Sequence, residues 1–338
     1  MTAIPTPDEN PKNKPSKRKK VIIILSLFLV FVITFISCFF IMVKLGEIRL
    51  RNSLVSSEKV EDDSEEKFDV IYHNGKKYKY NEDLINILLI GVDADNKDKK
   101  YQGQADALYL VSVDNQKNKV KIIGVSRNTM CNFGMIGIDG EAYSTEYGQI
   151  CLAFAYGNDD EQSSKNCVNA VSELLYGLPI NGYYTLYLDA VEKLVDAVGG
   201  VEVNLTENDS DIEYFSQKGN KVTLRGEEVN YYIQLRGSSN APRVERHKEF
   251  IRGFVNSAKK AIKKDLTLPL KLANEMKKYS VTDIDITSAV YLATQAVNWN
   301  IEFVNIKGEY GIEDGWETFT VDDADLKDVI INNFYIEI

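Results

Sequence analysis

The sequence is poor in the residues on which several kinds of site depend. Only four Cys and two His occur in 338 residues, and there is no Cys-x-x-Cys pair. These counts exclude a disulfide-dense scaffold, a zinc-finger type of site and a multi-histidine metal centre. Hydrophobic residues make up 44% of the chain, which is enough for a sizeable core and excludes global disorder.

Basic residues are also in the minority. The chain has 40 Lys and Arg against 50 Asp and Glu, a net charge of −10. Because non-specific nucleic-acid binding needs the opposite sign, we expect no nucleic-acid partner. The sequence also lacks a Gly-x-Ser-x-Gly motif, a Walker loop and a dinucleotide fingerprint, so it carries none of these common signatures of catalysis or nucleotide binding.

One long apolar run lies near the N-terminus. Residues 21–43 contain no charge, Gly or Pro, and as a helix they reach roughly 34 Å, enough to cross a hydrocarbon core of about 30 Å. A cleaved signal peptide has a shorter apolar region, about 7–15 residues, so we predict a transmembrane helix. Six basic residues precede the run and only three follow it closely. The positive-inside rule therefore predicts a cytoplasmic tail at 1–20 and an external location for the rest.

The segment 44–83 is predicted to be an extracellular spacer. Its residues 61–66 form a charge run with no apolar period, and 70–80 suggest a short hairpin around Asn74-Gly75. From residue 44 onward the chain holds 34 basic and 48 acidic residues, so a basic cluster on this part is informative.

Residues 84–338 have the pattern of an α/β domain. Near-continuous apolar strands are predicted at 85–95, 104–114, 119–126 and 183–189, and helices at 164–176, 190–198, 226–236 and 243–264. Strands and helices mixed in this rhythm predict a sheet covered by helices on both faces.

Two carboxylates lie at predicted strand ends. Asp93 ends the first strand and Asp106 lies at the start of the second, and strand ends are where α/β folds bind ligands. Two neighbouring carboxylates repel unless they share a proton or a cation, and oxygen ligands suit Mg²⁺ together with substrate phosphate. The alternative is a pair of solvated loop residues.

Four arginines form the second group of candidates. Arg127 follows the third strand, while Arg236, Arg243 and Arg246 fall within eleven residues around a predicted helix start. Guanidinium groups near a helix N-terminus suit phosphate oxygens, which predicts an anion site. The alternative is an ordinary surface Arg and a solvated helix start.

The cysteines outside the apolar run allow one disulfide. Cys131 is predicted to pair with Cys151 or Cys167, which closes the loop between them and leaves one free thiol. The spacing does not choose between the two pairings.

Six motifs in order, between about residues 84 and 335, resemble the LytR-CpsA-Psr family of bacterial cell-envelope enzymes. They are Gly91-Val92-Asp93, Asp106-Ala107-Leu108, Arg127-Asn128, the block Val195 to Val201, Leu224 to Glu227, and the pair Gln234-Leu235-Arg236 with Arg243 to His247.

The resemblance implies an α-β-α sandwich with a mixed central sheet and an apolar tunnel for a polyprenyl chain. It also implies an enzyme, a phosphotransferase at the membrane of a Gram-positive-type bacterium. Such an enzyme moves a teichoic acid or capsular polysaccharide from undecaprenyl pyrophosphate to peptidoglycan and forms a phosphodiester. By position, Asp93 and Asp106 would hold Mg²⁺, and Arg127, Arg236, Arg243 and Arg246 would bind the pyrophosphate.

The chain departs from the family pattern at four positions. Gln234 stands where an Arg is usual, Asn128 where an Asp is usual, Asn240 or a neighbour where another Asp is usual, and His247 where a Gln is usual. Loss of one charged hydrogen bond, worth about 1.5–3 kcal/mol, slows a reaction roughly ten- to over a hundredfold. The alternatives to a divergent transferase are a non-catalytic receptor for the lipid pyrophosphate and a hydrolase of it.

Overall fold

A computed structural model describes residues 34, 37, 39–54, 70–93, 103–137, 139–205, 215, 221–235, 240–296 and 298–338, with the side chains of 240–242 left out. Most of the predicted transmembrane helix, the tail 1–20, the charge run 61–66 and Arg236 lie outside these residues. Within the part that is described, no helix is both long and apolar enough to cross a membrane.

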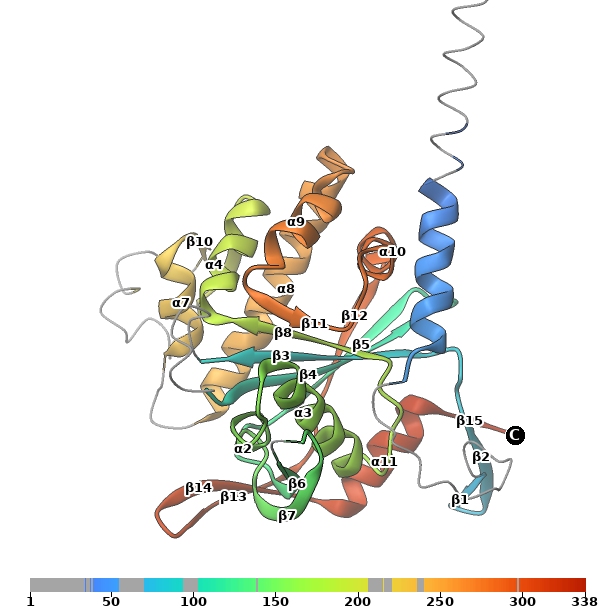
Figure 1. Ribbon diagram of the computed structural model, residues 1–338, viewed down its shortest axis with the longest axis vertical. Helices are drawn as coiled ribbons and strands as arrows, with labels where there is room; N and C mark the ends of the chain where they lie inside the picture. Colours follow the sequence, from blue (N-terminus) through green and yellow to red (C-terminus); the bar gives the residue numbers. More distant parts are fainter. Residues whose placement is uncertain are drawn as a thin grey trace, which may run out of the picture.

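A six-stranded mixed sheet forms the centre of the fold (Figure 1). Its order is β11 (Ser280–Thr282), β8 (Gly182–Tyr187), β3 (Ile85–Val92), β4 (Ala105–Asp114), β5 (Lys119–Val125) and β12 (Asn300–Val304). β3 pairs with β8 in parallel and with β4 antiparallel, and β5 pairs with β12 in parallel. β3 is buried along almost its whole length, as its continuous apolar sequence predicts.

Helices cover both faces of this sheet, which gives three layers (Figure 1). One face carries α2 (Leu152–Ala155), α3 (Asp160–Leu174) and α11 (Asp323–Phe334). The other carries α4 (Leu188–Ala197), α8 (Asn240–Lys264), α9 (Leu268–Met276) and α10 (Ile286–Ala296), with α7 (Glu227–Gln234) against α4 and α8. The predicted mixed sheet between two helical layers is therefore present.

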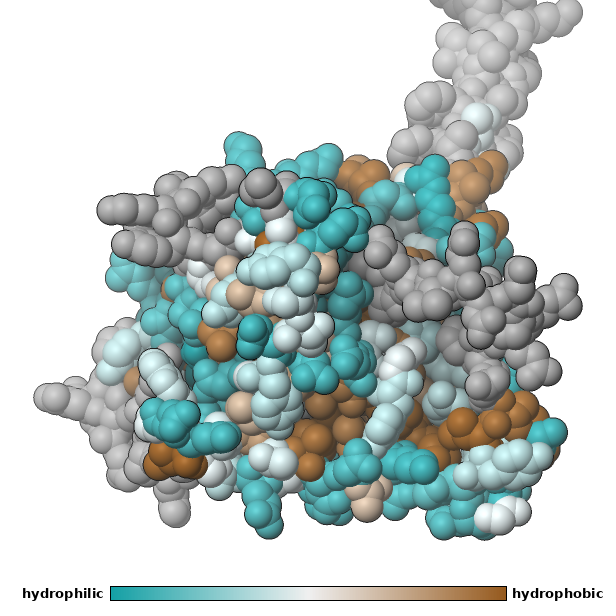
Figure 2. Space-filling model, turned by 60° about the horizontal axis from the view of Figure 1, so that its bottom comes forward, coloured by the Kyte–Doolittle hydropathy of each residue, from teal (hydrophilic) through white to brown (hydrophobic). Residues whose placement is uncertain are grey.

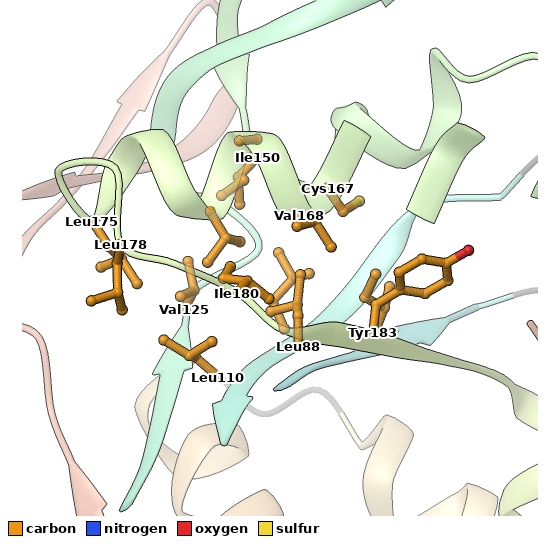
Figure 3. Close-up of a cluster of buried hydrophobic side chains, with 14 of the residues drawn as sticks. Leu88, Leu110, Val125, Ile150, Cys167, Val168, Leu175, Leu178, Ile180 and Tyr183 are labelled. Carbon is orange, nitrogen blue, oxygen red and sulfur yellow. The ribbon is translucent and has the colours of Figure 1, made fainter. Parts of the chain in front are cut away.

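The main core lies between α3 and the sheet (Figure 3). Val168 of α3 faces Leu88 and Leu110 of the central strands, and all three side chains are fully buried. The helix begins at an aspartate cap, since the Asp159 side chain accepts from the N–H of Gln162. Burial of its apolar side fixes α3 against the sheet.

Three antiparallel strand pairs and a small sheet lie outside the central sheet. They are β6 (Met130–Ile136) with β7 (Ala142–Gln149), β9 (Val201–Asn204) with β10 (Lys221–Leu224), β13 (Gly308–Glu313) with β14 (Trp316–Val321), and β1 (Ile71–His73) with β2 (Lys76–Tyr80) and β15 (Tyr335–Glu337). The β1–β2 turn holds Asn74 and Gly75 at φ of 50° and 76°, so the predicted hairpin is confirmed.

Parts of the segment predicted as a spacer pack on the domain. Residues 39–52 are helical, and Leu50 of this helix is 2% exposed in a cluster with Ile85. Its Gly46 lies against α10 so closely that a Cβ there would be 2.3 Å from the carbonyl oxygen of Thr287. Together with the β1–β2–β15 sheet, this means that packed structure begins before residue 84.

The predicted disulfide is wrong. Cys131, Cys151 and Cys167 are all buried free thiols. The loop that the disulfide was expected to close is closed instead by the β6–β7 ladder, in which Cys131 pairs with Gly148. Burial in apolar surroundings raises the pKa of the Cys131 thiol to about 12, which keeps it protonated and unreactive.

The surface is mainly hydrophilic, with hydrophobic side chains in patches, on the face that Figure 2 shows. Exposed apolar side chains are common on folded proteins, so exposure alone does not identify a functional surface. The charge of the surface and its position on the molecule are needed as well.

Candidate functional site

Asp106 of β4 holds two arginines from different parts of the chain. Its Oδ1 accepts from Nη1 of Arg127, and its Oδ2 accepts from Nη2 of Arg243 at 3.3 Å. The three side chains are only 14%, 19% and 13% exposed, respectively. Two guanidinium groups on one carboxylate leave a net positive charge, which suits an anionic ligand.

Arg127 is held in place by further contacts. Its Nη2 donates to Oε1 of Gln104 at 2.6 Å and lies 3.6 Å from the Sγ of Cys151. Burial acts to lower the pKa of Arg127, but the neighbouring Asp106 and Cys151 outweigh it and the pKa is raised, so the group stays charged. Gln104 was not found by sequence reasoning, because a single Gln before a strand carries no pattern.

Arg243 carries a second donor that points to a ligand. Its buried Nε has no hydrogen-bond partner in the described part of the structure. A buried N–H without a partner is costly unless something binds there. An anion beside Asp106 would satisfy it.

Asp93 lies at the same end of the sheet. It follows β3, which runs antiparallel to β4 with Val92 opposite Ala105. Its side chain is exposed, and its Oδ1 accepts from the backbone N–H of Gln104 at 3.2 Å. Gln104 therefore bridges Asp93 and Arg127, and the strand-end arrangement expected from the sequence is present.

Arg246 contacts the segment that follows α7. It is 3% exposed, and its Nη2 donates to the carbonyl oxygen of Leu235, just after α7. Its guanidinium therefore helps to hold the end of α7 against α8. Gln234 ends α7 and, with Arg243 and Asp93, lines a cavity described below.

His247 is a buried neutral residue between two hydrogen bonds. Its Nε2 lies 2.9 Å from the carbonyl oxygen of Ile233, and its Nδ1 lies 2.9 Å from the hydroxyl of Tyr109. A carbonyl only accepts, so Nε2 carries the proton and Nδ1 accepts from the tyrosine. Burial, together with the charges of Arg243 and Arg246, lowers the pKa of His247 to about 4.

This histidine predicts a loss of stability in acid. The folded-state pKa is below the ordinary 6.5, so the free energy of unfolding is unaffected above pH 6.5 and falls as the pH drops towards 4. The expected loss is about 3 kcal/mol. Thermal unfolding of the detergent-solubilised chain at pH 7 and pH 4.5 should show a smaller drop in His247→Gln, since Gln can make both hydrogen bonds without charging. Equal drops in the two proteins would contradict the assignment.

An apolar cavity of about 400 Å³ opens from the cluster on the α4 and α8 side of the sheet. Asp93, Asp106 and Arg243 lie at one part of its wall, and Val191 of α4 and Phe250 of α8 at another. A second apolar cavity of about 790 Å³ follows along the same two helices. It is lined by Leu194, Phe254, Ala258, Ile262 and Leu272 among others.

The two cavities are consecutive along the helices. Val191 and Leu194 are one turn apart on α4, and the rings of Phe250 and Phe254 stack at 6.4 Å on α8. An apolar track therefore leads from the arginine and carboxylate cluster towards α9.

A cavity of different character lies on the other side of Arg127 and Arg243. It has a volume of about 770 Å³ and is lined by Asn128, Tyr147, Gln149, Trp316 and Glu317, with both arginines in its wall. Amide and carboxylate groups beside aromatic rings suit a hydroxyl-rich ligand with an apolar face, such as a sugar. Sequence reasoning did not find this cavity, because its walls are mainly the hairpins β6–β7 and β13–β14.

Hydrogen bonds hold the β14 wall to the segment after Arg127. The N–H of Phe319 donates to the carbonyl oxygen of Asn128 at 2.8 Å, and Nδ2 of Asn128 donates to Glu317 at 3.2 Å. Nε2 of Gln149 donates to the carbonyl oxygen of Glu317 at 2.6 Å. Asn128 thus joins the two walls of this cavity through its neutral amide.

The residues predicted to hold Mg²⁺ have the right chemistry for it. No group of three or more His, Cys, Asp or Glu side chains placed to hold a metal ion occurs among the described residues, so at this site they offer the pair Asp93 and Asp106. Mg²⁺ is commonly bound by one or two carboxylates plus phosphate oxygens and water. The pair fits such a site only when a phosphate is present to supply the remaining oxygens.

Comparison with known proteins identifies the family. The family model of the LytR-CpsA-Psr family matches residues 48–333. The chain belongs to this family. The match begins in the helix of residues 39–52 and ends in α11, so it includes the part of the chain before residue 84.

Relatives of this family member carry a common name. The polyisoprenyl-teichoic acid–peptidoglycan teichoic acid transferase TagU of Oceanobacillus iheyensis is 25% identical over 252 residues, covering 73% of this chain and 74% of the relative. The TagU of Bacillus cereus strain ATCC 14579 is 30% identical over 152 residues, covering 45% of this chain and 44% of the relative. The latter match therefore spans less than half of that relative.

Solved structures agree with the fold of the LytR-CpsA-Psr domain. Bacillus subtilis TagV aligns with a TM-score of 0.58 at 22% identity, over 74% of this chain and 95% of that one. TagT bound to LIIa-WTA aligns with a TM-score of 0.58 at 20% identity, over 84% of this chain and 97% of that one. At these identities the likeness shows the fold alone.

Proposed function

We propose that this protein is a transferase that moves a glycopolymer from a polyprenyl pyrophosphate carrier to peptidoglycan and forms a phosphodiester. The observation that carries the proposal is the position of Asp106, Arg127 and Arg243 between an apolar cavity and a polar, aromatic one. The relatives named TagU, teichoic acid transferases by name, support the same reaction class.

The reaction needs three neighbouring environments: one for the lipid chain, one for the phosphates and one for the glycan. A hydroxyl of the acceptor attacks the phosphorus next to the glycan and releases its proton to water, the bridging P–O bond breaks, and polyprenyl phosphate leaves. The lipid chain belongs in the apolar cavities along α4 and α8. The glycan side belongs in the cavity walled by Tyr147 and Trp316.

The arginines act on the charge that develops on the phosphates. Arg127 and Arg243 are held by Asp106 before substrate binds, so they are oriented in advance. Donors fixed where charge develops stabilise the transition state more than the ground state. Mg²⁺ held by Asp93 and Asp106 would add positive charge to the same oxygens.

The protein must bind the lipid carrier at the outer face of a membrane, where peptidoglycan also lies. The uncharged run 21–43 with its basic tail supports a single-pass anchor with the N-terminus in the cytoplasm. A reporter fused to the C-terminus that is active only in the cytoplasm would contradict this orientation.

The metal dependence gives the direct test of the function. We expect the full chain in detergent to transfer a lipid-linked glycan to peptidoglycan with Mg²⁺, and calorimetry to show Mg²⁺ and the lipid pyrophosphate each tightening the other by the same factor. Asp106→Ala should abolish the metal dependence and most turnover, because it removes a proposed ligand and releases both arginines. Asp114→Ala, another carboxylate of β4, is the matched control and should remain active.

Other outcomes separate the alternatives. Binding without turnover would indicate a receptor, and release of phosphate without glycan transfer would indicate a hydrolase. Equal affinity for the lipid with and without Mg²⁺, together with an active Asp106→Ala protein, would contradict the metal assignment.

A further inference from the structure

The α8–α9 connection is unlike the rest of the domain in charge. Residues 259–278 contain seven Lys and two acidic residues, although residues 44–338 as a whole are acidic. Six of these lysines have exposed side chains: Lys260, Lys263, Lys264, Lys271, Lys277 and Lys278. A concentration of exposed lysines on an acidic domain indicates a partner with negative charge.

Exposed leucines lie among these lysines. Leu266, between α8 and α9, is 78% exposed, and Leu270 in the first turns of α9 is 42% exposed. Protruding apolar side chains flanked by Lys are typical of an element that lies in the interface of an anionic bilayer. A soluble acidic partner would account for the lysines but not for the exposed leucines.

The position of this connection agrees with a bilayer. Figure 1 shows the α8–α9 connection, in orange, at the same end of the molecule as the start of the blue helix 39–52. That helix follows the apolar run 21–43 along the chain. The α8–α9 connection and the start of the helix 39–52, where the proposed anchor would join the domain, therefore lie at the same end of the molecule.

The helix 39–52 is fixed to the domain by specific contacts. Arg49 lies 3.3 Å from Asp285, and the Oγ of Ser288 donates to the carbonyl oxygen of Gly46 at 3.2 Å. Further along, Nη1 of Arg51 donates to the carbonyl oxygen of Asp83 at 2.9 Å. Because this helix packs on the domain, an anchored chain presents one defined face to the membrane.

We propose that the α8–α9 connection, residues 259–278, docks on the surface of an anionic phospholipid bilayer. Leu266 and Leu270 insert at the level of the lipid headgroups, and the surrounding lysines bind lipid phosphates. Leu268 and Leu272 of α9 line the 790 Å³ apolar cavity, so docking brings one wall of that cavity to the lipid. The inference rests on the proposed anchor at 21–43, but not on the transfer reaction.

The β13–β14 hairpin offers a matched control surface. Ile312 is also 78% exposed, but it lies between Glu309, Glu313 and Asp314 and at the other end of the molecule (Figure 1). Equal apolar exposure with the opposite charge separates membrane docking from exposure alone.

The test places a tryptophan on each surface of the full chain. Leu266→Trp and Ile312→Trp are reconstituted into vesicles of phosphatidylcholine and phosphatidylglycerol whose acyl chains are brominated, which quenches fluorescence on contact. We expect quenching above the background of the native Trp299 and Trp316 for Leu266→Trp and none for Ile312→Trp. In pure phosphatidylcholine vesicles the quenching of Leu266→Trp should fall, because the lysines lose their partner.

A charge-reversal variant tests whether the lysines are needed for docking on the bilayer. Adding Lys263→Glu and Lys264→Glu to Leu266→Trp should abolish the additional quenching, while Lys76→Glu with Lys77→Glu, on the distant β2 strand, should leave it unchanged. Equal quenching at the two tryptophans in vesicles with which the protein floats would overturn the docking surface and leave the anchor standing. A chain that does not float with the vesicles would overturn both.

Discussion

Replacing Arg127 with lysine is expected to reduce glycopolymer transfer at least about a hundredfold, the cost of losing one preorganised donor to a developing charge. The guanidinium contacts Asp106 and Gln104 at the same time, with different nitrogens. A lysine ammonium is a single point charge on a flexible stem, so it cannot reproduce this fork. The charge is conserved in the variant, and the expected loss is therefore one of orientation.

The measurement is the rate of transfer from a saturating lipid-linked donor, which separates kcat from donor binding. We expect the loss mainly in kcat, because the proposed role is in the transition state. Arg252→Lys is the matched control, since Arg252 lies on α8 and packs over the ring of Phe303 at 4.7 Å. Transfer at the wild-type rate by Arg127→Lys would contradict the role of Arg127.

The four inner strands of the central sheet were predictable because they are mostly apolar, whereas the short edge strands β11 and β12 were not predicted. Ile85–Val92 is buried at nearly every position, so its sequence is nearly all apolar instead of alternating between apolar and polar residues. The β6–β7 hairpin was not predictable for the opposite reason. Ala142–Gln149 is exposed or partly exposed along its whole length, and no apolar period marks it as a strand.

The candidate site was predictable as far as strand ends determine it. Asp93 and Asp106 line the same cavity because antiparallel neighbours β3 and β4 bring the end of one beside the start of the next. Arg243 and Arg246 are three residues apart on α8, yet only Arg243 contacts Asp106. Which of two such residues faces a site depends on how the helix packs, and one sequence does not contain that information.

Most of the walls of the polar, aromatic cavity were beyond sequence reasoning. Tyr147 and Trp316 are 169 residues apart in the chain and line the same cavity. A local sequence pattern does not show how two hairpins so far apart in the chain are placed relative to each other. The departure at Asn128 has a structural context that only the fold reveals, because its amide is bonded to Glu317 of β14.

The apolar track along α4 makes a prediction about the length of the lipid donor. Val191 lines the cavity next to the arginine cluster, and Leu194, one turn further on, lines the cavity next to α9. Val191→Trp is therefore expected to weaken binding of both a short geranyl pyrophosphate donor and a long undecaprenyl one. Leu194→Trp is expected to weaken binding of the long donor only, since a short chain ends before it.

The size of the effect follows from apolar burial. Excluding two or three carbon groups from the cavity costs about 2 kcal/mol, so KM for an affected donor should rise at least about tenfold. Lys193→Trp, which lies between the two positions but has an exposed side chain, is the control for adding an indole to α4. It should leave KM for both donors unchanged.

The apolar track is identified by how each variant changes KM for the short donor and for the long donor. KM values of the two donors for wild type and the three variants would be measured with the same acceptor, so that differences reflect the lipid alone. If Leu194→Trp raised KM for the short donor as much as for the long one, the cavities would not be consecutive parts of one lipid path. If Val191→Trp changed neither donor, the chain would leave the cluster by another route, because an indole in a cavity of about 400 Å³ displaces whatever occupies it.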